Sequence, residues 1–241
     1  MLGGAGIGER THMTYSEVQG IAKQTIVYLE KTIVSGMTVA DIVSLAEQKM
    51  KALGVTKFWY WDIGALVFAG EETVLSVSGR DYRPSNYRIA GHDIVTVDLS
   101  PMVGHVWGDY ARTFIIEAGN VQTNIERICN PLFKEGLDVQ QKLHQHFQRI
   151  ASPHLTFEQV YHTMNRYIYE LGYENLDFAG NLGHSIEDCK SKRVYFEEGN
   201  HLQLADKAYF TFEPHVRKKN ATYGFKHENI YYVENGAIRE L

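Results

Sequence analysis

The sequence is poor in cysteine and proline, and it contains no long hydrophobic run. Its two cysteines, Cys129 and Cys189, are too few for a disulfide framework and form no CxxC pair that could bind zinc. No apolar stretch reaches the roughly 18 residues of a membrane span. The N-terminal MLGGAGIGERTHM also lacks the basic and apolar regions of a signal peptide. We therefore expect a cytoplasmic protein with no membrane partner.

An excess of positive charge is absent as well. The chain has 24 basic and 29 acidic residues among 241, a formal net charge of −5, which argues against a nucleic-acid partner. Hydrophobic residues make up 44% and charged residues 22%, close to the average for globular proteins. This composition excludes a disordered chain and predicts one or two packed domains.

Helical and strand-like patterns follow one another along the chain. Capping boxes at Thr14, Thr38 and Thr156 predict helices over 14–36, 38–54 and 156–172. A fourth helix is predicted over 124–150, with Pro131 and Gly136 as points where it kinks or breaks. Runs rich in β-branched and aromatic residues predict strands at 94–100, 109–117, around Tyr195, at 209–213 and at 225–233.

The helical segments 38–54 and 156–172 form a concealed repeat. Thr38 precedes Gly54 by the same number of residues as Thr156 precedes Gly172, and apolar residues match between them. Each such helix is followed by strands, which indicates two similar α-then-β halves. We expect an N-terminal tail over 1–13 and a single α+β domain over 14–241, with helices covering a mainly antiparallel sheet.

Four carboxylates in strand-like segments and a histidine in a glycine-rich segment are the candidate site residues. Asp98 lies within IVTVDLS, and Asp109 begins the returning strand of a hairpin, so the two can share one face. Glu213 ends the aromatic run YFTFE, Glu228 lies within GFKHENIYYV, and His184 lies within NLGHS. A buried carboxylate needs a cationic partner or a metal ion. Taken singly, each acid is explained by local partners, but the five together in this order favour a metal site.

Four converging carboxylates would repel one another unless cations neutralised them. Two divalent cations balance four negative charges, and oxygen ligands with one imidazole suit Mn²⁺, Fe²⁺, Co²⁺ or Zn²⁺. Two such ions with a bridging water would generate a hydroxide nucleophile and stabilise a tetrahedral intermediate.

The segments TVDLSPMVGHVWGDYARTF, LGHSI, FTFEPHV and FKHENIYYVENG resemble the methionine aminopeptidase, Xaa-Pro aminopeptidase and creatinase superfamily, peptidase family M24. The resemblance runs from about Thr14 to the C-terminus. It implies the duplicated pita-bread fold, two divalent metal ions such as manganese, a small peptide or small amide substrate, and a homodimer. The metal ligands that it implies are Asp98, Asp109, His184, Glu213 and Glu228.

The chain departs from this family at the catalytic histidines, which makes it an atypical member. The Xaa-Pro branch has a histidine 17 residues before the first metal aspartate, where this chain has Asp81 in DYRPS. Two further family histidines correspond to Gly180 and Ser191. His105 in the hairpin turn and His215 after Glu213 could supply the proton transfer. The candidate catalytic residues are therefore Asp81, His105 and His215.

Three functions remain open at this point. The first is hydrolysis of an amide bond by a hydroxide bound to two metal ions. The second is creatinase-like or lyase chemistry on a small non-peptide substrate, which the replaced histidines favour. The third is a non-catalytic peptide-binding module, and retention of all five ligands argues against it.

Overall fold

The computed structural model describes residues 13–241, so the expected tail over 1–13 falls outside the described residues except for Met13. In this described part, four α-helices come in two consecutive pairs, each followed by short strands. Within the described part, no helix combines the length and apolarity that crossing a bilayer requires. The α-helices are α1 (Tyr15–Thr32), α2 (Val39–Ala52), α3 (Pro131–Ile150) and α4 (Phe157–Glu170).

The strands of residues 13–241 are distributed over four small sheets, in which every pairing is antiparallel. Their orders are β2-β3-β6-β7, β1-β4-β5, β11-β10-β8 and β13-β12-β9. The strands are β1 (Lys57–Phe58), β2 (Ala65–Ala69), β3 (Asp93–Leu99), β4 (Pro101–Val103), β5 (Val106–Trp107), β6 (Tyr110–Glu117), β7 (Asn120–Val121), β8 (Tyr173–Asn175), β9 (Tyr209–Phe212), β10 (His215–Lys218), β11 (Gly224–Lys226), β12 (Asn229–Glu234) and β13 (Ala237–Glu240). Single turns of 3₁₀-helix are η1 (Gly70–Val74), η2 (Ile125–Arg127), η3 (Phe178–Gly180), η4 (Lys190–Lys192) and η5 (Leu204–Asp206).

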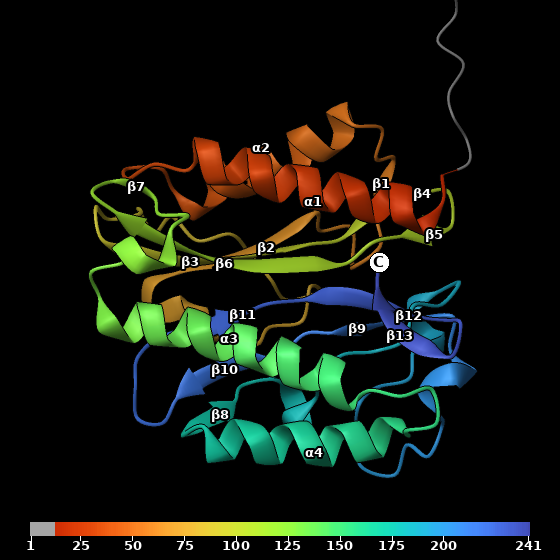
Figure 1. The fold of residues 1–241 in the computed structure, drawn as a ribbon. Helices are drawn as coiled ribbons and strands as arrows, with labels where there is room; N and C mark the ends of the chain where they lie inside the picture. The colour runs from red at the N-terminus through yellow and green to blue at the C-terminus, as the bar shows by residue number, and fades with distance from the viewer. Residues whose placement is uncertain (1–12) are drawn as a thin grey trace, which may run out of the picture.

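The molecule consists of two halves with the strands between them. Helices α1 and α2 lie on one outer side and α3 and α4 on the other, so that the sheets of the two halves face each other in the middle (Figure 1). Each half has its own hydrophobic core, one between α1, α2 and β2-β3-β6 and one between α3, α4 and the second-half strands. This confirms the α+β fold and places the seam between the halves at the centre of the molecule.

The repeat predicted from the sequence corresponds to α2 and α4. The side chains of the capping residues Thr38 and Thr156 both accept a hydrogen bond from the backbone amide of the third helical residue. The side chain of that residue accepts a hydrogen bond from the backbone amide of the threonine. After the helices, Gly54 and Gly172 adopt φ angles of +101° and +79°, a region that favours glycine. The same local signals therefore begin and end the equivalent helix of each half.

The helix predicted over 124–150 is shorter than expected. It begins at Pro131, and Asn130 caps it. Proline is tolerated at the first helical position because an N–H there has no partner within the helix. Gly136 does not interrupt it. The ring of Phe225 packs against the helix where a side chain at Gly136 would project, so the glycine permits a close contact instead of causing a kink.

The strand predicted over 225–233 is interrupted. His227 and Glu228 lie between β11 and β12, and the Glu228 amide donates to the carbonyl of Ala111 in the other half. Around Tyr195 a single bridge to His184 replaces the expected strand. Both departures occur where the chain approaches the seam.

Candidate metal centre

The first half contributes two carboxylates from neighbouring strands. Asp98 lies in β3 opposite Ala111 of β6, and Asp109 immediately precedes β6. The buried side chain of Gln19 on α1 fixes the Asp109 backbone, because its Nε2 donates to the carbonyl at 2.7 Å and its Oε1 accepts from the amide at 3.0 Å. A helix on the outer face therefore positions a carboxylate at the seam.

The second half contributes His184 and Glu213 through a close contact between two segments. The amide of His184 donates to Thr211 Oγ1 at 3.0 Å, and the amide of Thr211 donates to the His184 carbonyl at 2.8 Å. Gly183 has a φ of +132°, and a Cβ atom there would lie 2.6 Å from the Thr211 carbonyl oxygen. Only glycine fits this approach, which explains the glycine before the histidine.

Strand β6 holds the interrupted segment that carries Glu228. The Glu228 amide donates to the Ala111 carbonyl at 3.0 Å. Arg112 donates at 2.7 Å both to the Glu228 carbonyl and to Asn229 Oδ1. One backbone bond and two bonds from the Arg112 side chain thus set the position of the fifth predicted ligand across the seam.

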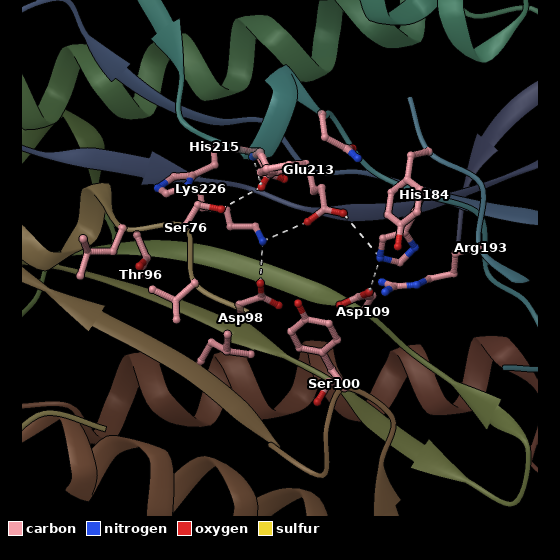
Figure 2. Close-up of a pocket in the computed structure, with 18 of the residues that line it drawn as sticks. Ser76, Thr96, Asp98, Ser100, Asp109, His184, Arg193, Glu213, His215 and Lys226 are labelled. Atoms are coloured by element: carbon pink, nitrogen blue, oxygen red, sulfur yellow. Dashed lines mark hydrogen bonds and ion pairs between the residues drawn. The ribbon is translucent and has the colours of Figure 1, made fainter. Parts of the chain in front are cut away.

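All five predicted ligands meet at the seam. Oxygens of Asp98, Asp109 and Glu228 lie within 4.8 Å of one another. His184 Nε2 lies 3.5 Å from Asp109 Oδ2 and 3.7 Å from Glu213 Oε1 (Figure 2). Asp109 therefore stands between a set of three carboxylates and a set that contains the histidine.

The electrostatics of this cluster fit divalent cations. Burial, together with neighbouring carboxylates, raises the pKa of Asp109 and of Glu228 well above the ordinary values. Both carboxylate oxygens of Glu228 are buried and have no hydrogen-bond partner among the described residues. Buried groups of this kind are normally satisfied, so this glutamate fits a metal ligand better than a structural residue.

His184 presents a lone pair to the carboxylates. Its Nδ1–H donates to the Ser185 carbonyl at 3.0 Å, and since a carbonyl only accepts, Nε2 carries the lone pair. Burial lowers the pKa of His184 to about 4, so the ring is neutral near pH 7. A lone pair facing carboxylate oxygens needs a cation between them, as a divalent ion would provide.

The sequence analysis missed a cation inside the cluster. Lys226 Nζ lies 2.6 Å from Asp98 Oδ2 and 3.0 Å from Glu213 Oε2 (Figure 2). Although burial opposes its charge, these carboxylates raise the pKa of Lys226 well above its ordinary value. The pKa of Glu213 lies below its usual range. Burial alone would raise it, but the electrostatic effects of Lys226 and His184 are larger and lower it. The sequence contained one signal for Lys226, its position two residues before Glu228. Side chains two residues apart in an extended segment point to the same side.

The cluster opens into a cavity of about 450 Å³ between the halves. Aromatic side chains form part of its wall, and Asp177, Ser76 and Arg193 add polar groups. Ser76 Oγ donates to Asp177 Oδ1 at 2.8 Å, and burial raises the pKa of Asp177. The sequence analysis had not singled out Asp177, Ser76 or Arg193.

Of the three candidate catalytic residues, only His215 lies at the cavity. His215 lines the cavity, and its Nε2–H donates to the Thr73 carbonyl at 2.7 Å. Burial lowers the pKa of His215 to about 4. Asp81 is exposed, pairs with Arg80 at 3.3 Å and lies outside the cavity wall. His105 is exposed in the β4–β5 turn and also lies outside it. The structure therefore does not bring Asp81 or His105 to the site.

Solved structures of similar fold include peptidases. An X-Pro aminopeptidase from Thermotoga maritima matches with a TM-score of 0.73 and 18% identity, over 94% of this chain and 59% of that one. A prolidase from Pyrococcus furiosus matches with a TM-score of 0.72 and 18% identity, over 94% and 61%. A methionine aminopeptidase from Thermotoga maritima matches with a TM-score of 0.72 and 17% identity, over 97% and 96%.

These similarities establish the pita-bread fold, while the chain spans only about three fifths of the X-Pro aminopeptidase and of the prolidase. No curated protein sequence matches the chain. The sequence model of metallopeptidase family M24 matches residues 14–235, nearly the whole chain, and the protein therefore belongs to metallopeptidase family M24.

Proposed function

We propose that the protein is a divalent-metal-dependent hydrolase that cleaves an amide bond in a small peptide or small amide, with two ions as the full complement. The observation that carries this proposal is the unsatisfied state of the cluster. Both oxygens of buried Glu228 lack partners, and His184 Nε2 faces the carboxylates with its lone pair. Cations at this position would satisfy these groups together.

In this proposal the residues of the site have separate roles in binding the ions and the substrate. The five predicted ligands (Asp98, Asp109, His184, Glu213 and Glu228) would hold the ions, which supply Lewis acidity and an activated water when bound. The cavity above them, of about 450 Å³, has room for a small substrate. Lys226 bonds one oxygen of Asp98 and one of Glu213 and so orients both carboxylates.

His215 is the remaining candidate for proton transfer among the three. Its ring is neutral near pH 7, because burial lowers its pKa to about 4. Since Nε2–H is bonded to the Thr73 carbonyl, Nδ1 is the nitrogen left to accept a proton from a substrate or water in the cavity. Asp81 and His105 have no part in this proposal.

A second candidate is creatinase-like hydrolysis of a C–N bond in a small non-peptide molecule. Its support is that His215 and His184 are the two histidines of the cavity wall, which leaves fewer proton-transfer groups than the family resemblance implies. Turnover of non-peptide amides, with no cleavage across a panel of dipeptides, would favour this candidate.

The test combines metal content with turnover. The purified protein is stripped with chelator and reloaded with Mn²⁺ or Co²⁺. Bound metal is counted by mass spectrometry, and hydrolysis of Xaa-Pro dipeptides, N-terminal methionine peptides and small amides is assayed. Substituting a residue that supports a ligand typically lowers activity about 10- to 100-fold, so Asp109→Asn and Glu228→Gln should lower it by at least about 100-fold.

The matched control is Glu135→Gln, a carboxylate that pairs with Lys218 outside the cavity. It should retain both metal and activity. A protein that takes up no divalent ion and hydrolyses nothing after reloading would overturn the proposal.

A further inference from the structure

We propose that Arg193 binds a carboxylate of the substrate, so that the site takes small anionic amides such as N-acylated amino acids and the C-terminal residue of short peptides. This inference rests on the proposed function, because it assumes that an amide of the same molecule reaches the carboxylate cluster. It adds a recognition residue to the five predicted ligands.

The first argument is the position of Arg193. Its side chain lines the cavity and lies beside Asp109 and His184 (Figure 2). It reaches that position from the loop after η4, which follows His184 along the chain. A substrate group bound by Arg193 would therefore lie next to the metal ligands.

The second argument is that the guanidinium is held in place. Its Nε donates to the Lys190 carbonyl at 3.0 Å. The guanidinium carbon Cζ packs against three aromatic rings, at 4.9 Å from the ring centre of Trp59, 5.3 Å from that of Tyr195 and 5.7 Å from that of Tyr60. Trp59 is fixed in turn, since its Nε1 donates to the Gly108 carbonyl at 3.0 Å. The chain thus orients the arginine before any ligand arrives.

The third argument is that its terminal N–H groups have no partner among the described residues. Among residues 13–241, no carboxylate oxygen lies within 4.0 Å of the Arg193 nitrogens, and its two terminal nitrogens donate to no protein group. Lys226, the other cation on the cavity wall, already bonds two carboxylates. Arg193 is therefore the cation of the cavity with donors to spare.

The chemistry of the guanidinium selects the ligand. Its two terminal N–H groups form a planar fork that matches the two oxygens of a carboxylate. The surrounding rings favour a flat group, and the nearby acidic cluster would repel the carboxylate unless the predicted metal ions are bound. The cavity of about 450 Å³ limits the remainder of the substrate to a few residues or fewer.

The experiment compares two probes that differ only in this charge, N-acetylglycine and N-acetylglycinamide. Their dissociation constants are measured by calorimetry on the wild-type, Arg193→Gln and Arg193→Lys proteins, each with and without Mn²⁺. We expect the Mn²⁺-loaded wild type to prefer the acid by about 10- to 100-fold, as a charge-assisted hydrogen bond provides. Arg193→Gln should abolish the preference, and Arg193→Lys should restore only part of it.

The matched control is Arg217→Gln, which removes an arginine that pairs with Glu174 outside the cavity and should leave the preference unchanged. A preference that survives in Arg193→Gln would overturn the inference, because the carboxylate would then be held elsewhere. An equal affinity of the wild type for both probes would also overturn it. Failure of the proposed function is distinguishable, since it is read from metal uptake and hydrolysis and not from the ratio of two dissociation constants.

Discussion

At the scale of single residues, one ammonium group determines how much positive charge the carboxylate cluster still needs. Lys226 bonds one oxygen of Asp98 and one of Glu213, which leaves the second oxygen of each carboxylate to face an ion. That oxygen of Glu213 also accepts a hydrogen bond from Thr211 Oγ1 at 3.1 Å. With all four carboxylates ionised, as metal ligands are, the carboxylates and Lys226 carry a net charge of −3. Two divalent ions would therefore leave the centre slightly positive, where carboxylates alone would leave it neutral.

Lys226→Met tests this competition. Removing the ammonium removes its repulsion of the incoming ions and frees two carboxylate oxygens, so Mn²⁺ should bind at least about 10-fold more tightly. The metal-free variant should be less stable than the wild type, because Asp98 and Glu213 lose their partner. Calorimetric titration with Mn²⁺ and thermal unfolding of the metal-free protein measure the two effects.

The control for this substitution is Lys218→Met, which removes a lysine paired with Glu135 outside the cavity. It should change neither quantity by more than the error of the measurement. Weaker Mn²⁺ binding by Lys226→Met would contradict the competition, and would mean that the ammonium chiefly orients the ligands.

Residues of the site differ in how far the sequence predicts them. The five ligands could be predicted because each stands in a motif of the family, and the acids also stand in strand-like segments. Arg193 could not, since its role depends on three aromatic rings brought together by the fold. The placement of Asp81 assumed a fixed count of residues before Asp98, and in the folded chain that segment turns away to the surface.

At the scale of secondary structure elements, local signals were sufficient for the helix ends and insufficient for contacts between elements. The capping boxes at Thr38 and Thr156 predicted α2 and α4 because their hydrogen bonds lie within four residues. Glu228 lies in a gap between β11 and β12, because its amide bonds to Ala111 more than a hundred residues away. No local pattern encodes such a partner.

Gly136 is a second case in which a local pattern does not predict a contact between elements, and it can be tested by substitution. Helix propensity predicts that Gly136→Ala in α3 stabilises the protein by up to about 1 kcal/mol. A Cβ atom there would lie 2.2 Å from the ring of Phe225, however, so the ring must move. We expect Gly136→Ala to lower the free energy of unfolding by about 1–3 kcal/mol, measured by urea denaturation.

The chain contains a matched control for this prediction in α1. A Cβ atom at Gly20 would meet no atom within 4 Å, so Gly20→Ala should raise the free energy of unfolding by about 0.5–1 kcal/mol. If both substitutions stabilised the protein equally, the contact between Gly136 and Phe225 would not be the close one described above.

At the scale of the whole molecule, the interior holds neutral imidazole rings that an acidic solution would charge only on unfolding. Burial lowers the pKa of His144 to about 3 and those of His184 and His215 to about 4. His144 is set between the elements of the second half, with Nδ1 at 2.9 Å from the Tyr231 hydroxyl and Nε2–H donating to the His227 carbonyl at 3.0 Å. These rings stay neutral in the folded protein at pH values where the unfolded chain binds protons.

The sign of the pH dependence follows from this difference. A histidine whose folded pKa lies below its unfolded value of about 6.5 contributes its full stability above pH 6.5 and loses it as the pH falls toward the folded pKa. Asp109 and Glu228 act in the opposite direction, since their raised pKa values favour the folded state at low pH. A comparison of variants at the same pH removes the contribution of these acids.

His144→Gln isolates one of these rings, because glutamine carries no charge at any of these pH values. Well below pH 6.5, the wild-type free energy of unfolding should fall by about 1.4 kcal/mol more per pH unit than that of the variant, since one histidine takes up one proton. Urea denaturation of the metal-free proteins at pH 7.5, 6.5, 5.5 and 4.5 gives the two slopes. The control His154→Gln removes an exposed imidazole and no buried contact. Parallel slopes for the wild type and His144→Gln would show that His144 becomes protonated without unfolding, and the second half would then open to water in acid.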